Sequence, residues 1–176
     1  MRVFLAIDLP EELRASIHDV SMGMPGAFAT VPASNLHITL HFLGDITDKK
    51  VYEVEGMMDS VRVKRFDATV KGISFFGGSS IQTVFAKVLD KGMSAKLHTP
   101  LATGLEAMGI ATDQREYLPH ITVARMKHPL PETKNFILKN SNLDFGSFVA
   151  DRFSLKKSVL SEKGASYEIL YERELS

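Results

Sequence analysis

The sequence contains no cysteine, no tryptophan and no net charge, and these absences exclude several classes of protein. Without cysteine the chain has no disulfide framework, thiolate nucleophile, cysteine-ligated zinc or iron–sulfur cluster. The 21 Lys and Arg residues balance 21 Asp and Glu residues, which argues against a protein that coats long nucleic acid but leaves room for a small basic pocket around one phosphate. No apolar run reaches the roughly 18 residues that a membrane span needs. We therefore expect a soluble cytoplasmic protein that makes no contact with a membrane.

The apolar content is that of an ordinary globular protein, at 44% of the 176 residues. This length suits one domain or two small lobes that share a core, so we expect residues 1–176 to form a single two-lobed domain. Strand and helix patterns are intermixed along the chain, which is typical of an α+β fold with antiparallel sheet. We expect strands at 2–8, 36–43, 66–74, 82–89, 118–124, 144–160 and 166–175, and helices from Pro10 onward and at 47–61, 93–108 and 131–138.

One four-residue pattern occurs twice, as His-Ile-Thr-Leu at 37–40 and as His-Ile-Thr-Val at 120–123. Both copies lie on expected strands, and each is followed by a helical segment and further strand, which indicates two related halves. Because side chains alternate along a strand, each histidine shares a face with the threonine two residues later. If the halves face each other, two imidazoles and two hydroxyls converge on one cleft.

Such a site suits phosphoester chemistry without a metal. A neutral imidazole can take a proton from the attacking oxygen, and the other, as an imidazolium, can protonate the leaving oxygen. The threonine hydroxyls can donate hydrogen bonds to the other phosphate oxygens. A single copy of the pattern would be weak evidence, because it arises often by chance, whereas two copies on strands are far more specific.

Two other classes of function stay open from the residues alone. The cleft can be a nucleotide or RNA-end binding module with little catalysis, although binding alone does not need two opposed proton-transfer groups. It can also be a metal site built from His37, His41 and His120. Against this, His37 and His41 lie about 13 Å apart along a strand, too far to share one ion.

The sequence around both motifs resembles that of the two-histidine phosphoesterase superfamily. It is most similar to the RNA 2′,3′-cyclic phosphodiesterase branch, historically called 2′-5′ RNA ligase. The resemblance is carried by the opening strand at 2–10, the first motif block at 35–44 and the second at 119–125, and it spans nearly the whole chain. It implies a bilobal α+β fold with pseudo-twofold symmetry. Each lobe would hold antiparallel sheet with helices outside, and the motifs would face each other across a central cleft.

The resemblance also implies roles for single residues. His37 would be the general acid and His120 the general base, which activates water against the 2′,3′-cyclic phosphate of an RNA end or small cyclic nucleotide and leaves a 2′-phosphate. Thr39 and Thr122 would hold phosphate oxygens, and Arg125 matches an arginine that follows the family's second motif. No metal or cofactor would take part, the protein would be a monomer, and the reverse reaction would join RNA ends by a 2′-5′ bond.

Arg125 raises a geometric difficulty. Strict alternation places it on the strand face opposite His120 and Thr122. It can reach the phosphate only if the strand ends or bulges at Ala124, or if the long side chain curls round the edge. The alternative is an ordinary surface arginine.

Three aromatic residues and one further histidine have two interpretations each. By alternation His41 shares the face of His37, so it can contact substrate in the cleft or be a half-exposed polar residue. Phe4 can stack on a base beside the cleft or pack in the core. Phe75 and Phe76 precede a flexible glycine pair, so they can cover a nucleobase, although we expect at least one ring in the core.

Three short basic clusters stand at 62–65, 125–127 and 156–157. They can guide an RNA end toward the cleft. A run of charge is more often a solvated face, and we expect that for the first and last clusters.

Overall fold

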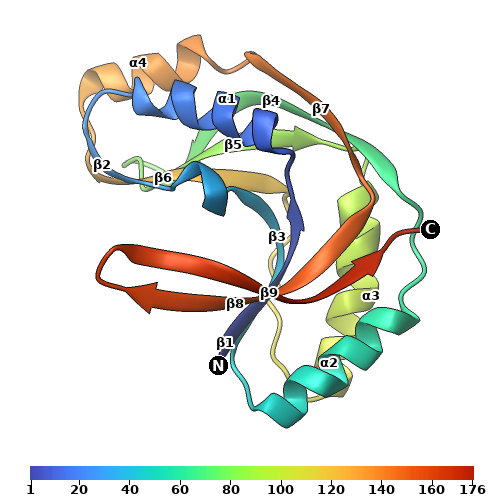
Figure 1. The fold of residues 1–176 in the computed structure, drawn as a ribbon. Helices are drawn as coiled ribbons and strands as arrows, with labels where there is room; N and C mark the ends of the chain where they lie inside the picture. The colour runs from blue at the N-terminus through green and yellow to red at the C-terminus, as the bar shows by residue number, and fades with distance from the viewer.

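The computed structural model describes residues 1–176 as two antiparallel sheets (Figure 1). One sheet has four strands, in the order β3 (His37–Asp45), β1 (Arg2–Asp8), β8 (Arg152–Ser161) and β9 (Gly164–Glu174). The other has five, in the order β2 (Ala27–Thr30), β6 (His120–His128), β5 (Thr83–Leu89), β4 (Phe66–Phe76) and β7 (Asp144–Ala150). The expected α+β class, with two lobes of antiparallel sheet, is confirmed.

Helices cover the side of each sheet that faces away from the other lobe (Figure 1). The five-stranded sheet carries α1 (Glu11–Met22) and α4 (Pro131–Lys139), and the four-stranded sheet carries α2 (Asp48–Ser60) and α3 (Met93–Ala107). A single cluster of 36 buried hydrophobic residues includes side chains of both sheets. None of the helices is both long and apolar enough to cross a bilayer.

The chain crosses between the lobes where the sequence pattern gives no sign of it. The continuous strand expected at 144–160 is wrong, because β7 pairs with β4 in one sheet and β8 pairs with β1 in the other. Asp151 alone separates these two strands, and neither glycine nor proline marks the crossing. The expected elements also lack β2 and the 3₁₀ helix Ala33–Asn35, which leads directly into the first motif.

Candidate active site

Both motif histidines begin a strand, and a carbonyl group two residues earlier holds each ring. His37 opens β3 and its Nδ1 lies 2.7 Å from the carbonyl oxygen of Asn35. His120 opens β6 and its Nδ1 lies 2.7 Å from the carbonyl oxygen of Leu118. A carbonyl oxygen can only accept, so Nδ1 donates its hydrogen in both rings. This leaves Nε2 of each imidazole available for proton transfer.

The first threonine lies beside its histidine. Nε2 of His37 is 2.8 Å from Oγ1 of Thr39, so the hydroxyl donates to the ring when the imidazole is neutral. Thr122 is the corresponding residue of the second motif and is half-buried like Thr39. Both hydroxyls are thus on the inner faces of the sheets, two residues after the histidines.

The same backbone irregularity follows each motif. Thr39 pairs with Ala6 and His41 with Leu5, so Leu40 is an extra residue in β3. Thr122 pairs with Phe85 and Ala124 with Val84, so Val123 is the extra residue in β6. Each insertion is a β-bulge, which places two successive side chains on the buried side and reverses the alternation that follows.

The bulge in β6 resolves the difficulty with Arg125. Because Val123 and Ala124 are both buried, Arg125 emerges exposed on the same face as His120 and Thr122. This arginine needs a strand end, a bulge or a curled side chain to reach a phosphate, and the structure has the bulge.

The equivalent bulge in β3 overturns the expectation for His41. The ring is 4% exposed and stacks on His98 of α3, with ring centroids 3.9 Å apart. Its Nε2 lies 2.9 Å from the His98 carbonyl oxygen. His41 therefore packs against α3 and does not share the face of His37. Strict alternation was wrong here because it cannot anticipate an inserted residue.

Phe42 takes the inner-face position that His41 leaves. It is the counterpart of Arg125 in the first lobe, since each lies five residues after its histidine. Strict alternation would place Phe42 on the face opposite His37, yet its side chain is 71% exposed. Comparing the two repeats beyond their four shared positions would have revealed this pairing.

A column of rings connects α3 to both motifs. His98 stacks on His41 on one side and on Tyr117 on the other, with centroids 4.2 Å apart for the second pair. The hydroxyl of Tyr117, just before the second motif, donates to the carbonyl oxygen of Thr39 in the first, at 3.1 Å. Burial, followed by the charge of His41, lowers the pKa of His98, which is about 4. The column therefore consists of neutral rings near neutral pH.

Aromatic side chains pack against each motif histidine. The ring centroid of His37 lies 5.0 Å from that of Phe4 and 5.4 Å from that of Tyr167. Phe4 is 3% exposed, so of its two interpretations the structure supports packing. These rings exclude water from one side of the imidazole and fix its plane.

His120 has aromatic neighbours of its own. Phe76 and Phe85 stack on each other, and their centroids lie 5.1 Å and 5.4 Å from that of His120. Phe75 packs against the hydrophobic core. One ring of the Phe75–Phe76 pair therefore packs against the core and the other lies beside the second motif.

The two motifs face each other across the lobes. Strands β3 and β6 lie in contact although they belong to different sheets. The charge of His120 contributes to the pKa of His37, and the charge of Arg125 contributes to that of Tyr167. Burial is the largest influence on His37 and lowers its pKa below 6.5.

An ion pair that the sequence analysis missed lies beside His37. Asp8 is the strand partner of His37, and its carboxylate pairs with the ammonium group of Lys156 from β8. The side chain of Lys156 is 9% exposed, so the expectation of a solvated basic face at 156–157 is wrong for this residue. Nothing in the sequence distinguishes the enclosed Lys156 from its neighbour Lys157.

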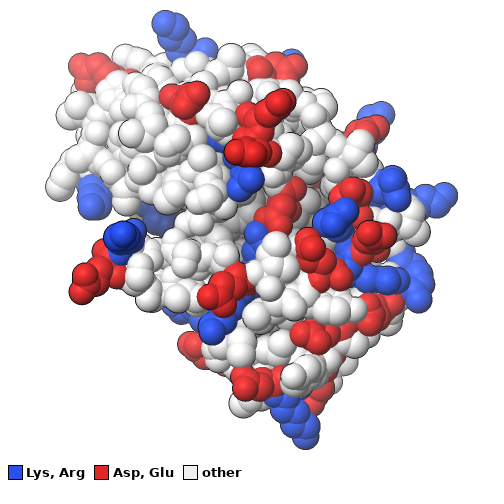
Figure 2. Space-filling model, in the orientation of Figure 1, with Lys and Arg blue, Asp and Glu red and all other residues white.

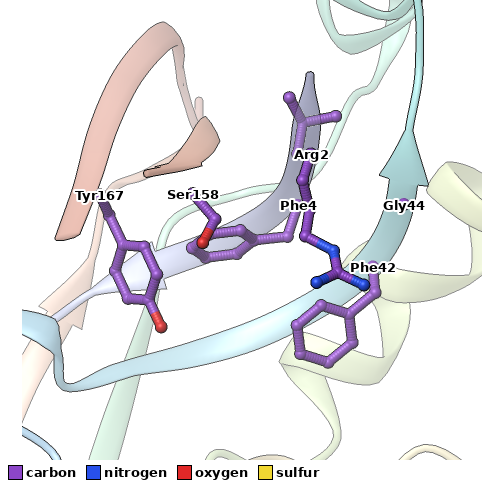
Figure 3. A pocket seen from close by; sticks show the side chains of 7 residues that line it. Arg2, Phe4, Phe42, Gly44, Ser158 and Tyr167 are labelled. Carbon is purple, nitrogen blue, oxygen red and sulfur yellow. The ribbon is translucent and has the colours of Figure 1, made fainter. Parts of the chain in front are cut away.

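A pocket of about 300 Å³ lies next to this region (Figure 3). Arg2, Phe42 and Tyr167 line it, together with Phe4 and Ser158. The guanidinium group of Arg2 lies near the Phe42 ring in Figure 3. The pocket thus offers one cation and exposed aromatic surface close to His37.

The structure gathers no set of three His, Asp or Glu side chains that could hold a metal ion. A site made of His37, His41 and His120 would need all three together, and His41 lies against α3 instead.

Comparison with known proteins assigns the family. Residues 9–159 match the family model of the 2′-5′ RNA ligase superfamily. The chain belongs to that superfamily. A relative from Archaeoglobus fulgidus named RNA 2′,3′-cyclic phosphodiesterase is 30% identical over 97% of this chain and 98% of its own length. A relative of the same name from Thermotoga maritima is 31% identical over 98% of this chain and 94% of its own.

Two solved structures share the fold. The crystal structure of TT0787 from Thermus thermophilus has a TM-score of 0.82 at 29% identity, over 99% of this chain and 98% of its own. That of Escherichia coli LigT complexed with 3′-AMP has a TM-score of 0.84 at 25% identity, over 99% of this chain and 98% of its own. The family resemblance drawn from the motif blocks is confirmed.

Proposed function

We propose that this superfamily member hydrolyses 2′,3′-cyclic phosphates at RNA ends or on small nucleotides and leaves a 2′-phosphate. The observation that carries the proposal is the pair of tethered histidines on facing strands, each with Nε2 available and a threonine two residues on. The names of the curated relatives support the substrate class.

The reaction needs one proton acceptor and one donor. Nε2 of His120 takes a proton from water as the water oxygen attacks phosphorus, and the bond from phosphorus to O3′ breaks. Nε2 of His37 gives its proton to the departing O3′, so the phosphate stays on O2′. The pair then exchanges one proton with solvent and returns to its starting state.

Three groups stabilise the negative charge that develops on the phosphate oxygens. Thr39 and Thr122 donate hydroxyl hydrogen bonds, and the guanidinium group of Arg125 donates two parallel ones. The bound phosphate also favours the imidazolium form of His37, which offsets the effect of burial on its pKa. Binding of substrate thus prepares the acid.

The pocket beside Phe4 fits the nucleoside part of the substrate. An exposed ring such as Phe42 offers a face on which any base can stack, and Arg2 can meet a phosphate further along the chain. LigT, which shares the fold, has been crystallised with 3′-AMP. We include in the proposal that residues 1–176 act as one two-lobed domain and as a cytoplasmic monomer, without metal or cofactor.

The test is turnover of a 2′,3′-cyclic nucleotide and of a short RNA with a cyclic end. His37→Ala and His120→Ala should each lower kcat by at least about 10²-fold, the lower range for one general acid or base, while the native fold is retained. Activity should persist in excess chelator. Near-normal activity in either variant would exclude the two-histidine mechanism, and tight binding without turnover in the wild type would indicate a binding module.

A further inference from the structure

Asp8 and Lys156 form an ion pair that the proposed reaction does not use. The pair lies at the inner face of the four-stranded sheet, with Asp8 directly opposite His37 in the strand pairing. Lys156 lies opposite Phe4, four residues before Asp8 on β1, so its side chain runs along β1 to reach the carboxylate.

The enclosure of the Lys156 charge beside a partly exposed Asp8 carboxylate needs an explanation other than stability. Ion pairs removed from water are rarely more stabilising than apolar side chains of the same size, because desolvation offsets their attraction. Lys156 has no other acidic partner, and its side chain is nearly enclosed. The position of the pair beside an imidazole that must carry a proton suggests a functional reason.

Both charges act on His37. Burial has the largest influence on the pKa of His37 and lowers it; the Asn35 carbonyl raises it, Lys156 lowers it and Asp8 raises it, followed by a small lowering by His120. The other titratable group packed on the ring is Tyr167 from β9, a phenol that is neutral near pH 7 and whose pKa burial raises further. Asp8 and Lys156 are therefore the two fixed charges that face His37.

We propose that Asp8 and Lys156 are positioning residues for His37, on the assumption that the proposed function holds. Lys156 keeps the Asp8 carboxylate from bonding the imidazole, so that Nδ1 stays on the Asn35 carbonyl and Nε2 stays directed at Thr39 and the substrate. The two opposite charges together set how readily His37 releases its proton to O3′.

The pair can be tested by removing one charge at a time. Lys156→Met leaves a free carboxylate next to the ring, so the pKa of His37 should rise. Asp8→Asn leaves a free cation, so the pKa should fall. A shift of about half a unit or more is expected in each direction, since both partners are close but Asp8 is partly exposed. The double variant should return near the wild-type value.

Two readouts separate this role from a merely structural one. The first is titration of the His37 imidazole by NMR in the free protein, which needs no turnover. The second is a ratio of two values of kcat/KM for a 2′,3′-cyclic nucleotide: the value at a pH above the pH optimum divided by the value at the optimum. This ratio should rise in Lys156→Met and fall in Asp8→Asn, by about threefold or more for each half-unit shift.

Matched controls use the neighbouring lysine and a conservative replacement. Lys157 follows Lys156 on β8 and points to the opposite face of the sheet, so Lys157→Met removes an equal charge and should leave both readouts unchanged. Lys156→Arg keeps the cation and should stay close to wild type. If Lys156→Met does not fold, Asp8→Asn alone still has to show the downward shift.

Shifts of the same sign, or no shift, in the His37 titration would overturn the proposal. If the His37 pKa shifts in opposite directions but the protein turns over no cyclic phosphate, the effect of the ion pair on His37 stands and the proposed reaction is refuted.

Discussion

Each motif histidine is held by a carbonyl group two residues before it, so the repeat sets the ring orientation as well as the residue type. The sequence predicts the pair His37 and His120 and their threonines, because a strand period of two places them on one face. It cannot predict Asp8 with Lys156, whose contact joins strands far apart in the chain. In the sequence, Asp8 looks like the ordinary end of a strand and Lys156 looks like part of an exposed basic cluster.

Arg125 should matter for turnover but not for folding. Arg125→Met removes a charged donor to the phosphate, and kcat/KM should fall by about 10²–10³-fold, as for loss of one donor that stabilises a developing oxyanion. The side chain is exposed, so the melting temperature should not change. Kinetics on a 2′,3′-cyclic nucleotide measure the effect, with Lys134→Met on the exposed side of α4 as a charge-matched control. Equal effects of the two substitutions would show that Arg125 acts only through net charge.

At the level of elements, the two bulges convert a simple repeat into a site. They place Phe42 and Arg125 on the inner faces, and they bury His41 against α3. The strands were predictable from alternating apolar residues. The insertion at Leu40 leaves no mark, because His41 continues the polar alternation in the sequence although its side chain is buried. For the same reason the crossing at Asp151 was not predictable, because the polar and apolar pattern continues through it.

The ring column between α3 and the motifs should make stability depend on pH. The pKa of His98 is lowered to about 4 in the folded protein, so the unfolded chain binds the extra proton between pH 6.5 and about 4. Stability is therefore complete above pH 6.5 and is lost as pH falls toward 4. Since His98 is partly exposed, we expect its share to be on the order of 1–2 kcal/mol, less than full burial would give.

Urea unfolding at a series of pH values measures this effect. His98→Gln removes the titrating group, so its free energy of unfolding should fall less steeply than that of the wild type over the same range. Carboxylates titrate in both proteins and cancel in the difference. Parallel curves for the two proteins would contradict the assignment.

At the scale of the whole molecule, two similar lobes surround one asymmetric site. His37 lies beside the Asp8–Lys156 pair and Tyr167, whereas His120 lies beside Phe76 and Phe85. In the proposed reaction, this difference in surroundings is what distinguishes the acid from the base.

The charge distribution suits a small or terminal ligand. Acidic and basic side chains are mixed over the face shown in Figure 2, and the formal net charge is zero. Long nucleic acids bind mainly through many phosphate contacts, which a mixed surface does not provide. The absence of net charge, read from composition alone, therefore agrees with recognition of one phosphate and its nucleoside.

The most direct measurement is phosphorus NMR of the products formed from a 2′,3′-cyclic nucleotide. A general acid that protonates O3′ predicts one product, the nucleoside 2′-phosphate. The wild type should form it at least about 10²-fold faster than His37→Ala or His120→Ala. A 3′-phosphate product would contradict the assignment of the leaving oxygen. An unchanged cyclic phosphate in the presence of folded wild-type protein would contradict the function itself.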